Sequence, residues 1–233
     1  MSDSGAATSS VEVRKSAILA LCLLVPVPSI GILGSTYGGG PWVWAASKAW
    51  LLTFPVCWWI WRDRGVVSWS PPRNGGLMTG LGSGIAIGLF VLMGYWLLGR
   101  VLIDDTSEVS QLLAKNRISS PAKYIGLALY LTLINAITEE YVWRWFVFAK
   151  CEVLTGRAKS VLLSAFFFSI HHFVVLVIYF DVLPALIATS GVFVGGVIWS
   201  WLYLKYRSIW PSYISHIGAD VAVFYAGWDL LGY

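Results

Sequence analysis

Charge is scarce in this sequence. Only 12% of its 233 residues are Asp, Glu, Lys or Arg, whereas 58% are hydrophobic, and the mean hydropathy is +0.72. A soluble core of this chain length cannot hide that much apolar surface from water, so a soluble globular domain is excluded. The scarcity of charge therefore predicts a multi-pass membrane protein whose solvent is the lipid bilayer.

Cysteine and histidine are also rare, at three residues each. Cys22, Cys57 and Cys151 are odd in number and form no Cys-x-x-Cys pattern, so we expect free thiols. The net charge of +4 comes from scattered basic residues without a patch, which argues against nucleic acid as a partner. We expect no cofactor.

Apolar stretches long enough for a spanning helix, at about 20 residues each, recur along the chain. They predict an all-α polytopic bundle of about seven transmembrane helices, at 16–35, 41–61, 76–99, 123–149, 160–180, 184–204 and 209–230. Residues 1–13 are rich in Ser, Ala and Thr and are predicted to form a disordered cytoplasmic tail. We expect residues 14–233 to form one transmembrane domain.

Two features predict details of these helices. Pro26 and Pro28 predict a kink in the first span. Small residues at helical spacing in the third span predict close packing against a neighbouring helix; they are Gly80, Gly82, Gly84 and Gly88.

Basic residues gather in alternate loops. They precede the first span and follow the second, fourth and sixth, as Arg14, Lys15, Arg62, Arg64, Lys150, Arg157, Lys159, Lys205 and Arg207. Because cytoplasmic loops carry an excess of Lys and Arg, we predict a cytoplasmic N-terminus and an inner (cytoplasmic) membrane location.

The span at 123–149 holds three ionisable residues, each of which costs about 2.5–3.5 kcal/mol near the bilayer centre. Glu140 and Arg144 are four residues apart, so their side chains can meet on one helix face. Glu139 lies about 100° around the helix. We expect Arg144 to neutralise Glu140, leaving Glu139 to face a cavity and accept a proton from water. A purely structural ion-pair cluster is the alternative.

All three histidines lie inside predicted spans. His171 and His172 are in the fifth, and His216 forms an i, i+4 pair with Asp220 in the seventh. At about 1.5 Å per residue, Glu139, His172 and His216 lie about 10–18 Å from the cytoplasmic ends of their helices. This agreement predicts one polar cavity that opens toward the cytoplasm.

A carboxylate with imidazoles can activate water and stabilise the oxyanion formed at a peptide carbonyl. Ser164, Ser169 and Ser215 lack a Gly-x-Ser-x-Gly setting, so a serine mechanism ranks lower. Two histidines and a carboxylate can also bind Zn²⁺, but the sequence has no His-Glu-x-x-His motif. A metal-free site is preferred and a metalloprotease stays open.

Three motifs in residues 123–225 resemble the CAAX protease and bacteriocin-processing (Abi) family of glutamic intramembrane proteases. They are Glu-Glu-x-x-x-Arg at Glu139, Glu140 and Arg144, Phe-x-x-x-His at Phe168 and His172, and His-x-x-x-Asn/Asp at His216 and Asp220. The resemblance implies that Glu139 and His172 activate the water and that His216 and Asp220 help form the oxyanion site. It implies that Glu140 and Arg144 organise the first of these helices.

Two positions leave alternatives. His171 also fits Phe-x-x-x-His through Phe167, and His172 is preferred because it shares a helix face with Ser164 and Phe168. Asp220 stands where the family commonly has asparagine, so it must be protonated or accept a hydrogen bond from His216.

The sequence therefore predicts an endopeptidase that cleaves a membrane-associated protein or peptide near the cytoplasmic face. A proton-coupled transporter or relay is an alternative from another class, although the chain shows no internal repeat. A catalytically inactive membrane-complex scaffold is the other. The sequence does not indicate the substrate or the oligomeric state.

Overall fold

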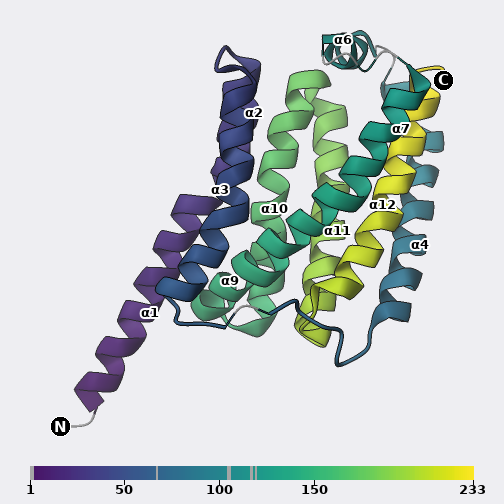
Figure 1. Cartoon of the computed structure of the whole chain (residues 1–233). Helices are drawn as coiled ribbons and strands as arrows, with labels where there is room; N and C mark the ends of the chain where they lie inside the picture. Colours follow the sequence, from purple (N-terminus) through teal and green to yellow (C-terminus); the bar gives the residue numbers. More distant parts are fainter. Residues whose placement is uncertain (1–2, 67, 104–105, 116–117, 119) are drawn as a thin grey trace.

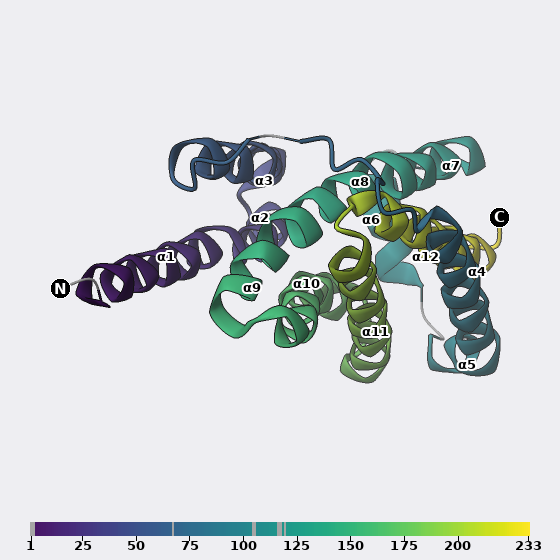
Figure 2. The ribbon, with the colours of Figure 1, turned by 90° about the horizontal axis from the view of Figure 1, so that it is seen from below.

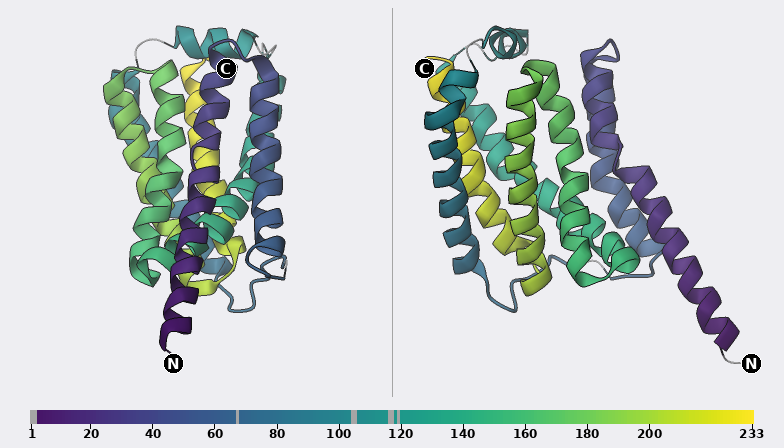
Figure 3. Two further views of the ribbon diagram at one scale, coloured as in Figure 1. Left: turned by 90° about the vertical axis from the view of Figure 1, so that its left-hand side faces the viewer. Right: turned by 180° about the vertical axis from the view of Figure 1, so that it is seen from behind.

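Helices are the only regular secondary structure in the described part of the chain. The computed structural model describes residues 3–233 except 67, 104–105, 116–117 and 119, and every element in that part of the chain is helical, as predicted. In chain order they are α1 (Asp3–Leu24), α2 (Val27–Thr36), α3 (Gly40–Trp61), α4 (Leu77–Gly94), η1 (Tyr95–Gly99), α5 (Arg100–Leu102), α6 (Ser107–Lys115), α7 (Pro121–Leu129), η2 (Tyr130–Asn135), α8 (Ala136–Glu139), η3 (Glu140–Val147), α9 (Phe148–Thr155), α10 (Arg157–Tyr179), α11 (Val182–Tyr206) and α12 (Ile209–Leu230). Helices α4, α10, α11 and α12 run side by side, α1 projects obliquely from the bundle, and α6 lies across one end (Figures 1 and 3).

By length and composition, five helical stretches in the described chain can cross a membrane. They are Val11–Thr36, Leu77–Gly99, Pro121–Thr155, Arg157–Tyr179 and Val182–Tyr206, and they indicate a multi-pass membrane protein. Helices α3 and α12 occupy the other two predicted positions with 22 residues each, but they are not among the five. Seven spans and a cytoplasmic N-terminus thus stay predictions.

The N-terminal region differs from the prediction in one respect. Helix α1 begins at Asp3, so most of the stretch expected to be a disordered tail is helical and continuous with the first span. Its Ala, Glu, Arg and Lys residues favour helix and offset the Ser and Thr content from which disorder was predicted. The predicted kink is confirmed, because α1 ends at Leu24 and α2 begins at Val27, on either side of Pro26.

Helix α4 packs directly on the backbone of α12, which confirms the predicted role of Gly80, Gly84 and Gly88. The prediction is wrong for Gly82, because a Cβ added there would meet nothing within 4 Å. A Cβ added at Gly84 would lie 3.0 Å from the Cα of Ser215, and one added at Gly218 would lie 2.6 Å from the backbone of Gly84. Only glycine permits this approach. This close contact positions α12 at Ser215, the residue that precedes His216.

The stretch Pro121–Thr155 is one long helix that crosses the bundle diagonally in front of α10 and α11 (Figures 1 and 2). Two of its segments, η2 and η3, are wide π-helical turns. Such turns re-aim side chains and occur often at functional sites, and η3 begins at Glu140. The three cysteines are free, as predicted.

Candidate active site

The ion pair predicted between Glu140 and Arg144 is present. Both side chains are fully buried, with Arg144 Nη1 3.3 Å from Glu140 Oε1. The guanidinium also lies over the rings of Phe168, at 4.4 Å, and Trp199, at 5.1 Å. Cation–π attraction thus supplements the carboxylate in holding this charge inside the protein.

Glu139 faces a different environment from Glu140. Its side chain is 14% exposed and lines a cavity of about 410 Å³, whereas Glu140 is fully buried and does not line that cavity. The two carboxylates are therefore divided as the helix geometry predicted: one is neutralised by an arginine and one is presented to the cavity.

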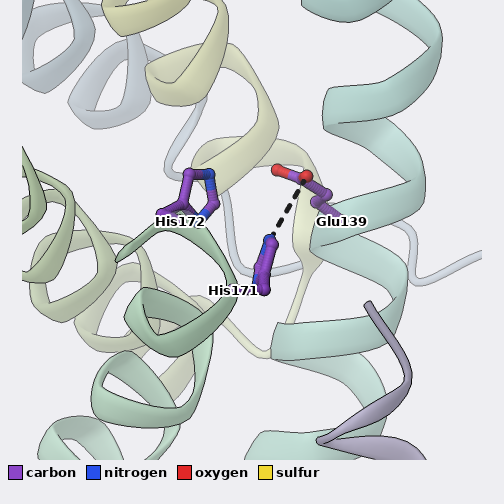
Figure 4. Close-up of side chains that lie close together, drawn as sticks. All are labelled: Glu139, His171 and His172. Atoms are coloured by element: carbon purple, nitrogen blue, oxygen red, sulfur yellow. Dashed lines mark ion pairs between the residues drawn. The ribbon is translucent and has the colours of Figure 1, made fainter. Parts of the chain in front are cut away.

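Both neighbouring histidines of α10 line the cavity beside Glu139 (Figure 4). His171 Nε2 lies 3.9 Å from Glu139 Oε1, and its ring stacks on Trp143 with an interplanar angle of 6°. His172 Nδ1 lies 3.0 Å from the carbonyl oxygen of Phe168. Because a carbonyl only accepts, Nδ1 of His172 carries the proton and Nε2 is the basic nitrogen. The structure brings both histidines to Glu139, and the choice of His172 remains a prediction.

His216 lies among three carboxylates. Its Nδ1 is 2.9 Å from Glu140 Oε1, and its Nε2 is 3.7 Å from Glu139 Oε2 and 3.6 Å from Asp220 Oδ1. The ring stacks on Trp199 with centroids 4.0 Å apart. All six predicted site residues thus meet in one cluster, and Glu140 makes the closest contact to His216.

The cavity extends from Glu139 away from the Lys- and Arg-rich loops, whereas the sequence predicted an opening toward them. Its lining includes Trp44, Lys48, Leu131, Val175 and Phe224, which lie on the side of the α2–α3 turn and the α10–α11 turn. The Arg- and Lys-rich loops are at the opposite end, which we call the basic end (Figure 1). The prediction that the cavity opens toward the basic end is therefore wrong. That prediction was based on how far Glu139, His172 and His216 lie from the ends of their helices. This distance does not show on which side of these residues the neighbouring helices separate to form a cavity.

The three serines weighed as nucleophiles are engaged elsewhere. Ser164 donates to the carbonyl of Trp143, Ser169 donates to that of Ala165, and Ser215 accepts from Trp199 Nε1. None of them lines the cavity. The geometry gives no support to a serine mechanism.

Sequence reasoning missed two polar residues of the cavity. Lys48 of α3 donates to Asn135 Oδ1 at 2.6 Å, and Asn135 Nδ2 donates to Glu139 Oε1 at 2.9 Å. A lysine inside an apolar stretch was the available signal for the first. For Asn135 the signal was its position four residues before Glu139, which puts both side chains on one helix face.

Glu139, His171 and His172 also satisfy a simple test for metal binding. Each offers one ligand atom, and these atoms lie within 4.8 Å of one another. Two imidazoles and a carboxylate are a common zinc ligand set. The cluster can therefore serve either a metal or a water that is activated by the side chains alone.

Comparison with known proteins gives one match. Residues 121–222 match the family described as type II CAAX prenyl endopeptidase Rce1-like. The match confirms the resemblance to the CAAX protease and bacteriocin-processing family and supports a protease at the level of enzyme class. The matched stretch contains all six predicted site residues, from Glu139 to Asp220. No curated protein and no solved structure matched the chain.

Proposed function

Because residues 121–222 match the Rce1-like family, we propose that this protein is a glutamic intramembrane endopeptidase that needs no metal. It hydrolyses a peptide bond of a membrane-associated protein or peptide. The observation that carries the proposal is the division of two adjacent carboxylates, with Glu139 in the cavity and Glu140 buried on Arg144.

In the proposed reaction a water in the cavity attacks the peptide carbonyl carbon. Glu139 accepts a proton from this water as the new C–O bond forms, and His172 Nε2 accepts the hydrogen bond that orients the water. Glu139 then delivers the proton to the amide nitrogen, the C–N bond breaks, and a carboxylic acid and an amine leave. The protein ends the cycle in its starting protonation state.

His216 stabilises the oxyanion in this scheme. Its Nδ1–H donates to Glu140, so a donor at Nε2 requires the imidazolium form. Three surrounding carboxylates favour that cation, and Nε2 lies at the cavity between Glu139 and Asp220. Asp220, whose Oδ1 lies 3.6 Å from Nε2, supports the imidazolium through its charge, because the Nε2–H donates to the oxyanion in this scheme.

The substrate reaches Glu139 from the end of the bundle with the α2–α3 turn, because the cavity extends that way. With the N-terminus in the cytoplasm this is the non-cytoplasmic side of the membrane. The family suggests a prenylated C-terminus as the first substrate to test.

The central experiment compares wild-type protein with Glu139→Gln, which keeps the shape and removes the base. The probe is an internally quenched peptide with a farnesylated Cys-aliphatic-aliphatic-X C-terminus, incubated with protein in proteoliposomes. In parallel, mass spectrometry compares the termini of membrane proteins from cells that express either form. We expect Glu139→Gln to lose cleavage by about 10²–10⁴-fold, the contribution of a general base.

Glu152→Gln is the matched control. Glu152 lies on the same long helix but pairs with Arg207 at the basic end, outside the cavity. It should cleave as the wild type does. Equal processing by wild type and Glu139→Gln, in both assays, refutes the protease and favours a scaffold.

A further inference from the structure

The N-terminal helices, which lie outside the family match, reach the catalytic carboxylate through two hydrogen bonds. Lys48 Nζ lies 2.6 Å from Asn135 Oδ1, and Asn135 Nδ2 lies 2.9 Å from Glu139 Oε1. Lys48 comes from α3, whereas Asn135 ends η2 and Glu139 ends α8. The chain of contacts therefore joins two separate parts of the bundle at the cavity.

Lysine has only donors, and this fixes the amide of Asn135. The amide oxygen must face Lys48, so the amide NH₂ must face Glu139. Without Lys48 the amide could turn over and present its oxygen to the carboxylate, which would repel it. The lysine thus determines that Glu139 receives a hydrogen bond.

In the described structure Lys48 has no other contact that explains the free-energy cost of placing its ammonium group in an apolar helix. No carboxylate of the described residues lies within 4.0 Å of its ammonium group, unlike Lys150, which pairs with Asp63. A half-buried ammonium group in an apolar helix is expensive and marks a function by default. Its remaining contact is to the ring of Trp44, 5.6 Å away.

We infer that Lys48 and Asn135 are positioning residues that orient the carboxylate of Glu139 for catalysis. The inference deepens the proposed function and rests on it, because Glu139 is a catalytic base only in the proposed function. Oε1 is held by Asn135, which leaves Oε2 turned to the Nε2 of His216. Helices α2 and α3, which line the cavity, therefore form part of the active site.

A spectroscopic test needs no substrate. Infrared difference spectra, wild type minus Glu139→Gln at one pH, isolate the carboxylate bands of Glu139. Repeating the subtraction in Lys48→Met and Asn135→Leu should shift those bands, because the carboxylate loses a donor. The control Thr53→Val, whose hydroxyl donates to the carbonyl of Ala49 of the same helix, should leave them in place. Unshifted bands in both variants overturn the inference, whether or not the protein is a protease.

Kinetics supply the second readout where the wild type cleaves the farnesylated peptide. Lys48→Met and Asn135→Leu should each lower kcat by about 10–100-fold with little change in KM, the loss typical of removing an orienting partner. Lys48→Arg, which keeps the charge and the donors, should recover most of the rate. The double variant should lose no more than the worse single one, because the two residues act as a unit. Additive losses, or no rescue by arginine, contradict the inference.

Discussion

His216 Nδ1 and Glu140 Oε1 lie 2.9 Å apart, and this contact sets the orientation of the imidazole. The same oxygen of Glu140 lies 3.3 Å from Arg144, so one buried carboxylate serves a cation on its own helix and a histidine on α12. We therefore propose that the second acidic residue of the Glu-Glu-x-x-x-Arg motif acts through His216, while the first faces the cavity.

Changing Glu140 should impair catalysis through His216. In Glu140→Gln the imidazole loses an ionised acceptor, so we expect kcat to fall by about 10–100-fold while KM changes little. Asp220→Asn should keep more activity, because Asp220 is the more distant partner at 3.6 Å and the carboxylates of Glu139 and Glu140 still favour the imidazolium. Steady-state cleavage of the quenched peptide measures both. A greater loss for Asp220→Asn would assign the orienting role to Asp220 instead.

Arg144 should matter more for stability than for chemistry. Removing one partner of a buried ion pair costs about 3–5 kcal/mol, because the other charge is left without compensation. Arg144→Met should therefore lower the free energy of unfolding in detergent by an amount of this order. The double variant with Glu140→Gln should be less destabilised than the sum of the single variants, because the pair is removed together. Strict additivity would show that the two charges are not coupled.

The helical positions and the polar cluster could be predicted from the sequence because each depends on local spacing. Glu140 and Arg144 meet since four residues return to one helix face, and α3 and α12 begin and end within a residue or so of the predicted spans. The contacts between helices could not be predicted. The approach of Lys48 to Asn135 and the side on which the cavity lies depend on how α2 and α3 pack, which no spacing in one helix encodes.

The packing of α4 on α12 should be disrupted by an added side chain at some glycines of α4 and unaffected by one at others. In Gly84→Val the new Cβ meets the backbone of α12 at 3.0 Å, so we expect a loss of about 1–3 kcal/mol from overpacking and weaker cleavage as His216 shifts. Gly82→Val is the matched control, since a Cβ there meets nothing within 4 Å. Thermal unfolding in detergent and the peptide assay measure the difference. Equal stability of the two variants would contradict the close contact.

Metal removal should leave the enzyme active. The cluster of Glu139, His171 and His172 is spread over 4.8 Å, and in our proposal a water occupies it rather than an ion. Purified protein should contain zinc well below one equivalent, and dialysis against a chelator should not change the cleavage rate. Stoichiometric zinc together with loss of activity on chelation and recovery on zinc addition would replace the glutamic mechanism with a metal-dependent one.

The side of the membrane from which substrate enters follows from the orientation of the bundle. The basic loops should face the cytoplasm, which puts the cavity and the α2–α3 turn on the opposite side. In a variant whose three cysteines are replaced, Tyr37→Cys and Asp181→Cys should react with a membrane-impermeant maleimide on intact spheroplasts. Arg73→Cys and Arg157→Cys should react only after lysis, and all four positions are exposed in the structure. The reverse labelling pattern would put the N-terminus outside, and the cavity of Glu139 would then receive its substrates from the cytoplasm.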